Sequence, residues 1–157
     1  MWNLSLQNPE ATHEIGRALG AAAQSGCVVA LSGPLGAGKT CLSQGVAAGL
    51  GVTGPVTSPT FIILAVYDGG RLPLHHADLY RLGDPEELRE LGLEEAFAPP
   101  AVSLVEWADR FPELLPADHL AVSLDYADGD TRSLSAEAHG PRSQALLEAA
   151  RAAWMAR

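Results

Sequence analysis

The chain has 157 residues, a length that suits one domain with a single hydrophobic core. Hydrophobic residues make up 47% of the chain and charged residues 18%, a composition that excludes an intrinsically disordered protein. The net charge is −9 and no run of Lys or Arg occurs, which argues against direct binding to nucleic acid.

The N-terminal residues predict a strand and no targeting signal. Trp2, Leu4 and Leu6 alternate with polar residues, as they do in a half-buried strand. No basic segment followed by an apolar run is present here, and no stretch of about 18 apolar residues occurs along the chain. We therefore expect a cytoplasmic protein with no membrane partner.

A helix and a buried strand are expected next. Asn8 can cap a helix, and Pro9 and Glu10 suit its first turn, so the helix should run to about residue 24. Residues 27–32 form a continuous apolar run, which is typical of a strand that is buried on both faces.

A glycine-rich loop, GPLGAGKT, separates this strand from a helix expected over 39–50. It matches G-x-x-x-x-G-K-[ST] at every fixed position, and its Lys39 is the only lysine in the chain. Glycines let backbone N–H groups curl around a phosphate, and the start of the helix adds its positive dipole end. The Lys39 side chain can span the β- and γ-phosphates, and the Thr40 hydroxyl can bind Mg²⁺. A glycine-rich turn that merely precedes a helix is the alternative.

The loop predicts a nucleotide-binding site. Its residues are Gly33, Pro34, Leu35, Gly36, Ala37, Gly38, Lys39 and Thr40. ATP is favoured over GTP, because an Asn-Lys-x-Asp motif for guanine cannot exist when the single lysine lies in the loop and the only asparagines are Asn3 and Asn8.

The remaining elements alternate between strands and helices. A hairpin is expected over 57–80 around an Asp-Gly-Gly turn, then a short acidic helix, a buried strand, a second hairpin and a C-terminal amphipathic helix. The short helix is expected over 85–91, the buried strand over 101–105, the second hairpin over 119–126 and 132–138, and the C-terminal helix over 143–155. This alternation indicates an α/β sandwich.

Glu106 follows the buried run 101–105, so its carboxylate is expected at the C-terminal edge of the sheet, where ligands of open α/β folds bind. This is the position of a Walker B acid, the carboxylate that accompanies a phosphate-binding loop. A solvent-facing strand end is the alternative. Trp107 belongs either to the core, which the sequence favours, or to the surroundings of the nucleotide.

Two further motifs have both a functional and a structural interpretation. In a strand over HHADLYR, His76, Asp78 and Tyr80 share one face, and an acid there could complete a magnesium shell through water. The alternative is an edge strand with one solvated face. TSPTF, residues 57–61, suits a segment that responds to the γ-phosphate, but an ordinary loop would have the same composition.

The motifs GPLGAGKT, TSPTF, HHADLYRL with DPEEL, and VSLVEW, in this order and at this spacing, resemble those of the TsaE family, formerly called YjeE. Its members are small bacterial P-loop ATPases required for the threonylcarbamoyl modification of the adenosine beside the anticodon of certain tRNAs. The resemblance covers nearly the whole chain. It implies one domain over residues 1–157, with a P-loop NTPase-like three-layer α/β sandwich, a mixed, mainly parallel central sheet and hairpin additions.

The resemblance also implies roles for individual residues. Lys39 and Thr40 would bind phosphate and Mg²⁺, Glu106 would be the acidic magnesium ligand, and Asp78 would assist the metal or the attacking water. Lys39, Asp78 and Glu106 are thus the candidate catalytic residues, and Thr40, Glu106 and Asp78 the candidate metal ligands.

The expected cofactors are ATP and Mg²⁺, and the expected partners are TsaB and TsaD, of which TsaD carries the threonylcarbamoyl transfer. Such partners would supply most of the tRNA contact for an acidic protein. Thr12 and Arg132 resemble positions that border the nucleotide in the family.

Two residues depart from the family pattern. Pro34 stands where an acidic residue is usual, and Cys41 follows Thr40 where a second hydroxyl is usual. A thiol is a weaker donor, so the contact of Cys41 with the α-phosphate is expected to be poorer.

Two other functions fit the same loop: a small-molecule kinase, and an interaction module that binds ATP as a structural ligand. The kinase is less favoured because Arg110 is the only arginine between Glu106 and Arg132 for a phosphate-binding lid.

Overall fold

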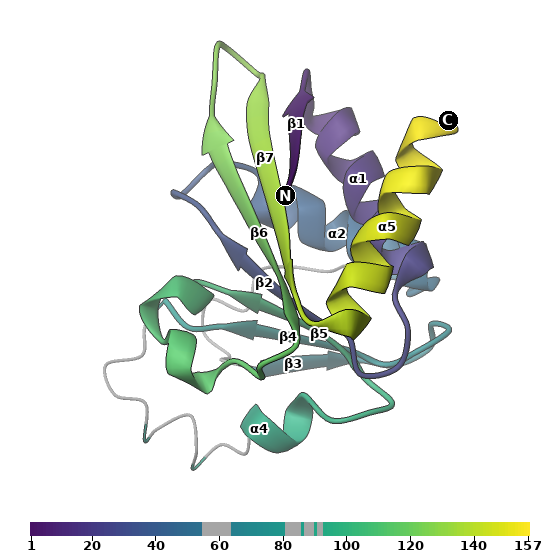
Figure 1. The fold of residues 1–157 in the computed structure, drawn as a ribbon, viewed down its shortest axis with the longest axis vertical. Coiled ribbons are helices and arrows are strands. Elements are labelled where there is room, and N and C mark those ends of the chain that lie inside the picture. Colours follow the sequence, from purple (N-terminus) through teal and green to yellow (C-terminus); the bar gives the residue numbers. More distant parts are fainter. Residues whose placement is uncertain (55–63, 81–85, 87–89, 91–92) are drawn as a thin grey trace.

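The computed structural model describes residues 1–54, 64–80, 86, 90 and 93–157. Within that part of the chain, seven strands form one sheet in the order β1-β7-β6-β2-β5-β4-β3 (Figure 1). The strands are β1 (Trp2–Leu6), β2 (Val28–Ser32), β3 (Leu64–Tyr67), β4 (Leu74–Asp78), β5 (Val102–Glu106), β6 (His119–Tyr126) and β7 (Arg132–His139). The helices are α1 (Pro9–Ala22), α2 (Lys39–Leu50), α4 (Leu93–Ala96) and α5 (Pro141–Met155), with 3-10 turns η1 (Ala108–Arg110) and η2 (Pro112–Leu114).

The sheet is mixed, as the resemblance implies, and its parallel part is confined to the centre. The pairs β6–β2, β2–β5 and β5–β4 are parallel. The pairs β1–β7, β6–β7 and β3–β4 are antiparallel and extend the two sides of the sheet. Because parallel strands end at the same edge, the centre of the molecule has one edge at which several strands finish.

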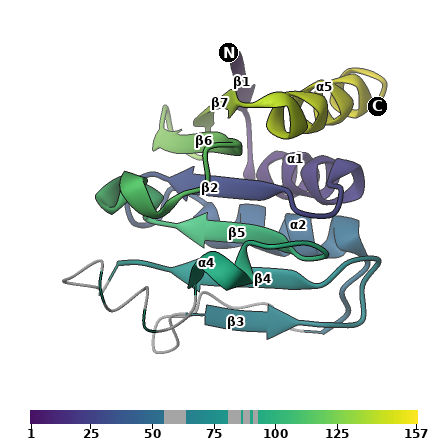
Figure 2. The ribbon, with the colours of Figure 1, turned by 60° about the horizontal axis from the view of Figure 1, so that its bottom comes forward.

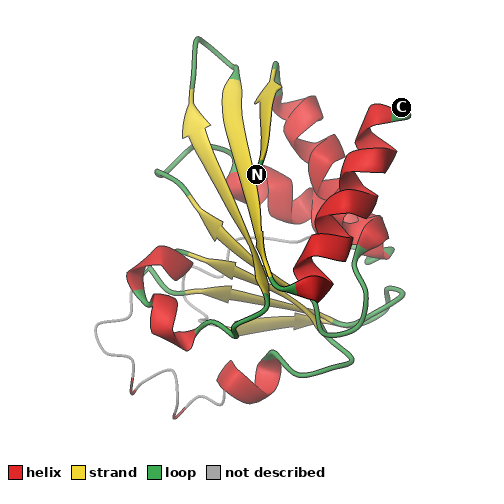
Figure 3. Cartoon of the chain, in the orientation of Figure 1, coloured by secondary structure: helices red, strands yellow, loops and turns green. Residues whose placement is uncertain are grey.

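The sheet separates two hydrophobic clusters. Along β2, Val29 and Leu31 face the cluster formed with α1, α2 and α5, whereas Val28 and Ala30 face a smaller cluster with α4 and the 3-10 turns. Figures 2 and 3 show the three long helices on one side of the sheet and the short elements on the other. The alternation along a strand that is buried on both faces thus produces the three layers.

Helices α1 and α2 pack backbone to backbone. Cβ atoms added to Gly16 and Gly20 of α1 would lie 2.3 Å and 2.1 Å from backbone oxygens of α2. The same holds in reverse for Gly45 and Gly49, each 2.2 Å from a carbonyl oxygen of α1. Only glycine permits this approach, which fixes the position of α2, the helix that follows the phosphate loop.

Helix α1 begins as predicted and ends two residues early. The Asn8 side chain accepts a hydrogen bond from Ala11 N at 2.8 Å, and Pro9 is the first helical residue. At the other end, Ala23 has extended backbone angles. Arg71, in the β3–β4 turn, donates to the carbonyls of Gly20, Ala21 and Ala23 at 3.0, 3.2 and 2.7 Å, so a cation distant in sequence completes the helix end.

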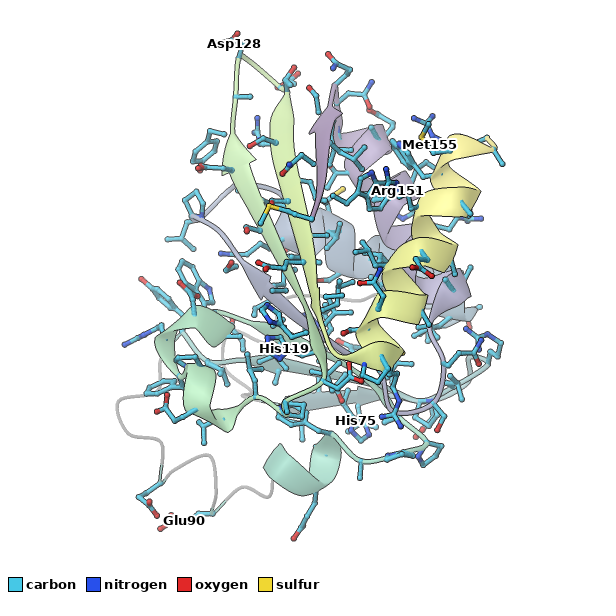
Figure 4. All side chains as sticks on the ribbon, in the orientation of Figure 1. His75, Glu90, His119, Asp128, Arg151 and Met155 are labelled. Atoms are coloured by element: carbon cyan, nitrogen blue, oxygen red, sulfur yellow. The ribbon has the colours of Figure 1, made fainter. Side chains whose placement is uncertain are left out.

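Both predicted hairpins are present in the described residues. Strands β3 and β4 pair across the Asp-Gly-Gly turn, and β6 and β7 pair along their whole length. Figure 4 places Asp128 at the tip of the second hairpin and His119 at its opposite end. Helix α5 starts two residues before its predicted range. Residues 57–61 lie outside the described part, as does most of the helix predicted over 85–91. None of the described helices has the length and hydropathy of a transmembrane span.

Candidate active site

The phosphate loop joins the end of β2 to the start of α2, as the pattern predicts. Gly38, the residue before α2, has φ 108° and ψ 14°, a left-handed conformation that glycine adopts without strain. Gly33 has φ 143°, and a Cβ atom there would lie 2.2 Å from the carbonyl oxygen of Leu124 on β6. Both glycines are therefore required by this loop conformation and by its contact with β6.

The single lysine lies inside this loop. Lys39 is only 5% exposed, and its ammonium group donates to the carbonyl oxygen of Gly33. Its Nζ also lies 3.5 Å from the ring centroid of Trp107, a cation–π contact. Burial lowers the pKa of Lys39, while the nearby carboxylates of Glu106 and Asp78 act to raise it. The lysine is thus held at the base of the loop in a partly desolvated, acidic environment.

Two carboxylates stand at the edge of the sheet beside this lysine. Asp78 is the last residue of β4 and Glu106 the last of β5, and the two are directly paired in the parallel ladder. Asp78 is 8% and Glu106 2% exposed. Asp78 Oδ1 also accepts a hydrogen bond from Tyr80 N at 2.9 Å. The solvent-facing alternative for Glu106 is therefore wrong, because the strand end is buried beneath the loop.

A cavity of about 370 Å³ brings these groups together. Lys39, Thr40, Asp78 and Glu106 share its wall. The remaining lining residues are Leu35, Gly36, Gly38, Cys41, Tyr80 and Trp107. A larger hollow of about 460 Å³ lies on the outer face of β1, β6 and β7, but its lining is rich in serine and contains no cation. The first cavity therefore has the chemistry that a polyphosphate requires.

A second, smaller cavity of about 170 Å³ adjoins the loop. Thr12 of α1 and Arg132 of β7 line it. The other lining residues are Pro9, Gly36, Ala37, Gly38, Cys41 and Asp130, three of which also line the first cavity. Thr12 is 2% exposed, and Arg132 donates to the carbonyls of Gly129 and Thr131. The two residues that resemble nucleotide-bordering positions thus lie beside the loop.

Of the two residues that depart from the family pattern, Cys41 lines the cavities and Pro34 does not. The Cys41 thiol lies between the two cavities and donates to the Pro9 carbonyl at 3.3 Å. Burial raises the pKa of this thiol, and Glu10 adds to the effect. Pro34 is exposed, and neither it nor Gly33 belongs to the lining of either cavity in the described structure.

His76 and Trp107 lie at the site although the sequence indicates no function for His76 and favours a core position for Trp107. His76 is fully buried, and its Nε2 lies 2.5 Å from Glu106 Oε2. Trp107 packs partly against the smaller cluster but also contacts Lys39 and the Tyr80 ring, whose plane is tilted by 43° at 4.8 Å between centroids. The edge-strand interpretation of HHADLYR is wrong, since β4 lies between β3 and β5. The spacing of His76, two residues before Asp78, places it on the same face of the strand as that acid. Its contact with Glu106, however, depends on the order of the strands in the sheet.

Comparison with known proteins identifies the family. The sequence model of the TsaE family, described as threonylcarbamoyl adenosine biosynthesis protein TsaE, matches residues 6–134. The chain belongs to the TsaE family. Relatives named tRNA threonylcarbamoyladenosine biosynthesis protein TsaE include those of Bacillus subtilis and Streptomyces coelicolor. The first is 45% identical, covering 90% of this chain and 88% of the relative, and the second 46% identical, covering 75% and 81%.

A solved structure shares the fold. The crystal structure of YdiB from Bacillus subtilis superposes with a TM-score of 0.83 at 37% identity, covering 96% of this chain and 93% of that one. The resemblance found in the motifs is confirmed, and so is the P-loop NTPase-like α/β fold. TsaE family membership assigns the chain to the biosynthesis of threonylcarbamoyladenosine in tRNA.

Proposed function

We propose that this chain is a cytoplasmic ATPase of tRNA threonylcarbamoyladenosine biosynthesis, which binds and slowly hydrolyses Mg-ATP and acts with a TsaB–TsaD-like complex. The observation that carries the proposal is the cavity in which the Lys39 ammonium, the Thr40 hydroxyl and the paired Asp78 and Glu106 carboxylates meet. TsaE family membership supports the pathway.

The residues present fit a magnesium nucleotide. No group of three or more His, Cys, Asp or Glu in the described residues could hold a metal ion by itself. Magnesium at nucleotide sites is bound through one or two carboxylates together with phosphate oxygens and water, so the set of Thr40, Glu106 and Asp78 is sufficient. When bound, Mg²⁺ neutralises charge on the phosphates.

The chain's own residues would act on ATP as follows. Backbone N–H groups of the loop cradle the phosphates, and the Lys39 ammonium exchanges its contact with the Gly33 carbonyl for phosphate oxygens. Thr40 and Glu106 would hold the metal. Asp78, beside Glu106 at the strand ends, orients the attacking water and accepts its proton.

Hydrolysis by the isolated chain is expected to be slow. Among the described residues, none of those that line the Lys39 cavity is an arginine, and Arg110 donates instead to the Tyr80 carbonyl. An arginine that reaches the transferred phosphoryl group typically contributes about 10³–10⁵-fold in rate. A slow ATPase is useful when its nucleotide state alters a partner, which is the role proposed here.

Asp78→Asn should lower single-turnover phosphate release by about 100-fold while ATP binding is retained, because the amide fills the same space but cannot take a proton. Asp109→Asn is the matched control, since Asp109 is exposed and does not line the cavity but also places a carboxylate near Lys39. Equal rates in the wild type and Asp78→Asn would remove Asp78 from the catalytic residues.

Adding a purified TsaB–TsaD-like complex should accelerate phosphate release by the wild type. Phosphoryl transfer to a metabolite in place of water would favour the kinase instead. If the complex neither binds this protein in the presence of ATP nor changes its phosphate release, the partner assignment fails while nucleotide binding at the loop stands.

A further inference from the structure

His76 is a buried polar residue that the proposed chemistry does not use. It lies on β4, two residues before Asp78, and its exposed fraction is 0%. Its Nε2 lies 2.5 Å from Oε2 of Glu106 on the adjacent strand. Among the described residues, its Nδ1 has no hydrogen-bond partner.

The contact has a defined direction. We assign Nε2 of His76 as the donor, because an ionised carboxylate only accepts hydrogen bonds. In the neutral ring, Nδ1 then carries a lone pair. A buried polar atom without a partner destabilises the fold, whereas an apolar side chain of similar size at this position would have no such cost. Packing alone therefore does not explain a histidine here, and its one directed contact is with Glu106.

The backbone explains why His76 reaches this carboxylate. His76 pairs with Leu104 in the parallel ladder, and Asp78 pairs with Glu106. Leu74 and Leu104 belong to the cluster under α1, α2 and α5, whereas Ala77 belongs to the other, so alternation places His76 on the side of the sheet that carries α2. One strand thus supplies both Asp78 and the donor to Glu106.

We infer that His76 is a positioning residue, which holds Oε2 of Glu106 by a hydrogen bond and so presents the other carboxylate oxygen to Mg²⁺ in the loop cavity. This inference rests on the proposed function. A carboxylate that ligates a metal is usually oriented by such a partner, whose loss typically lowers metal affinity about 10–100-fold.

The test separates the metal from the nucleotide. The dissociation constant of a fluorescent non-hydrolysable ATP analogue is measured with excess Mg²⁺ and with EDTA. The ratio of the value in EDTA to the value in Mg²⁺ reports how much the metal strengthens binding. His76→Leu should lower this ratio about 10–100-fold and leave the affinity in EDTA unchanged, because the loop and Lys39 are intact.

The conservative variant His76→Gln places an amide N–H near the position of Nε2 and should recover most of the ratio. His76→Asn carries the same amide one methylene shorter and should not, so this pair decides the question even if the leucine variant fails to fold. His75→Gln, on the same strand but with its ring directed to the Ala96 carbonyl at 2.7 Å, should behave as the wild type.

A double-mutant cycle assigns the effect to Glu106. In a Glu106→Ala background, His76→Leu should cause no further loss of the ratio, because the carboxylate that His76 contacts is already absent. A wild-type ratio in His76→Leu, equal losses with Mg²⁺ and with EDTA, or additive losses in the cycle would each overturn the inference. Failure of the wild type to bind the analogue more tightly with Mg²⁺ would instead overturn the proposed function.

Discussion

Lys39 holds its charge inside the protein. Its ammonium group lies between the Gly33 carbonyl and the Trp107 ring, and burial lowers its pKa. A buried ammonium with a lowered pKa is less favourable in the folded state than in water, so this side chain adds little to the stability of the fold. Its position suits an anion that enters the cavity.

Lys39→Met should therefore melt within about 3 °C of the wild type without nucleotide, since about 1 kcal/mol corresponds to 2–4 °C at this size. ATP with Mg²⁺ at about 100 times its dissociation constant should raise the melting temperature of the wild type by about 5–10 °C and that of the variant not at all. Arg151→Met, which removes an exposed positive charge from α5, is the control. An equal ATP-induced rise in Lys39→Met would contradict the phosphate role.

For individual residues, the sequence predicts the contacts between residues that are near one another in the chain. The loop glycines, Lys39 and Thr40 lie within eight residues, so their spacing alone defines the phosphate-binding pattern. The contact between His76 and Glu106 joins residues 30 apart and exists only because β4 and β5 are neighbours. The position of Trp107 against Lys39 likewise depends on how β5 lies beside the loop.

Among the helices, packing and capping come from distant segments. Glycines let α1 and α2 meet, Arg71 completes the end of α1, and Asp118 caps α5. Local signals predict a helix boundary well only where the cap is local. The start of α1 follows from Asn8 and Pro9, whereas its end depends on Arg71. No local pattern near residue 24 marks that arginine as a cap.

Gly20→Ala tests whether packing outweighs helix propensity. Alanine is favoured over glycine within a helix by about 0.5–1 kcal/mol, but the new Cβ would lie 2.1 Å from the Val46 carbonyl oxygen. We expect a net loss of about 1–3 kcal/mol in the free energy of urea unfolding. Ala21→Gly, at the adjacent exposed position, calibrates the propensity term. A stabilised Gly20→Ala would show that the two helices are further apart than described.

Asp118 gives a pH-dependent contribution. Its carboxylate accepts from Arg142 N at 2.8 Å and Ser143 N at 2.9 Å at the start of α5, where Gly140 offers no side-chain cap. Burial acts to raise the pKa of Asp118, but the hydrogen bonds, mainly from Ser143, and the charge of Arg142 outweigh it and leave the pKa below its usual value.

Because the folded pKa is lowered, the stabilisation is present above about pH 4 and is lost as the pH falls through the folded value. Asp118→Ala should lower the free energy of unfolding by about 1 kcal/mol at pH 7, and the difference from the wild type should shrink at pH 3 and below. A difference that does not change with pH would mean that the charge of the carboxylate plays no part.

At the scale of the whole molecule, the order of the strands makes the site. Strands β2, β5 and β4 are parallel neighbours, so the loop after β2 and the carboxylates that end β5 and β4 meet at one edge. The alternation of helices and buried strands predicts the α/β class. It does not predict that β1 pairs with β7, since that contact joins residues as far apart in the chain as Trp2 and Ala136.

One Mg-ATP is expected to bind where these three strands end. Equilibrium dialysis of the full chain against labelled ATP with excess Mg²⁺ tests this binding, with Lys39→Met dialysed in parallel. We predict saturable binding of one ATP per chain in the wild type and none in the variant at the same concentrations. Absence of saturable binding by the wild type, or one ATP bound by both proteins, would contradict it.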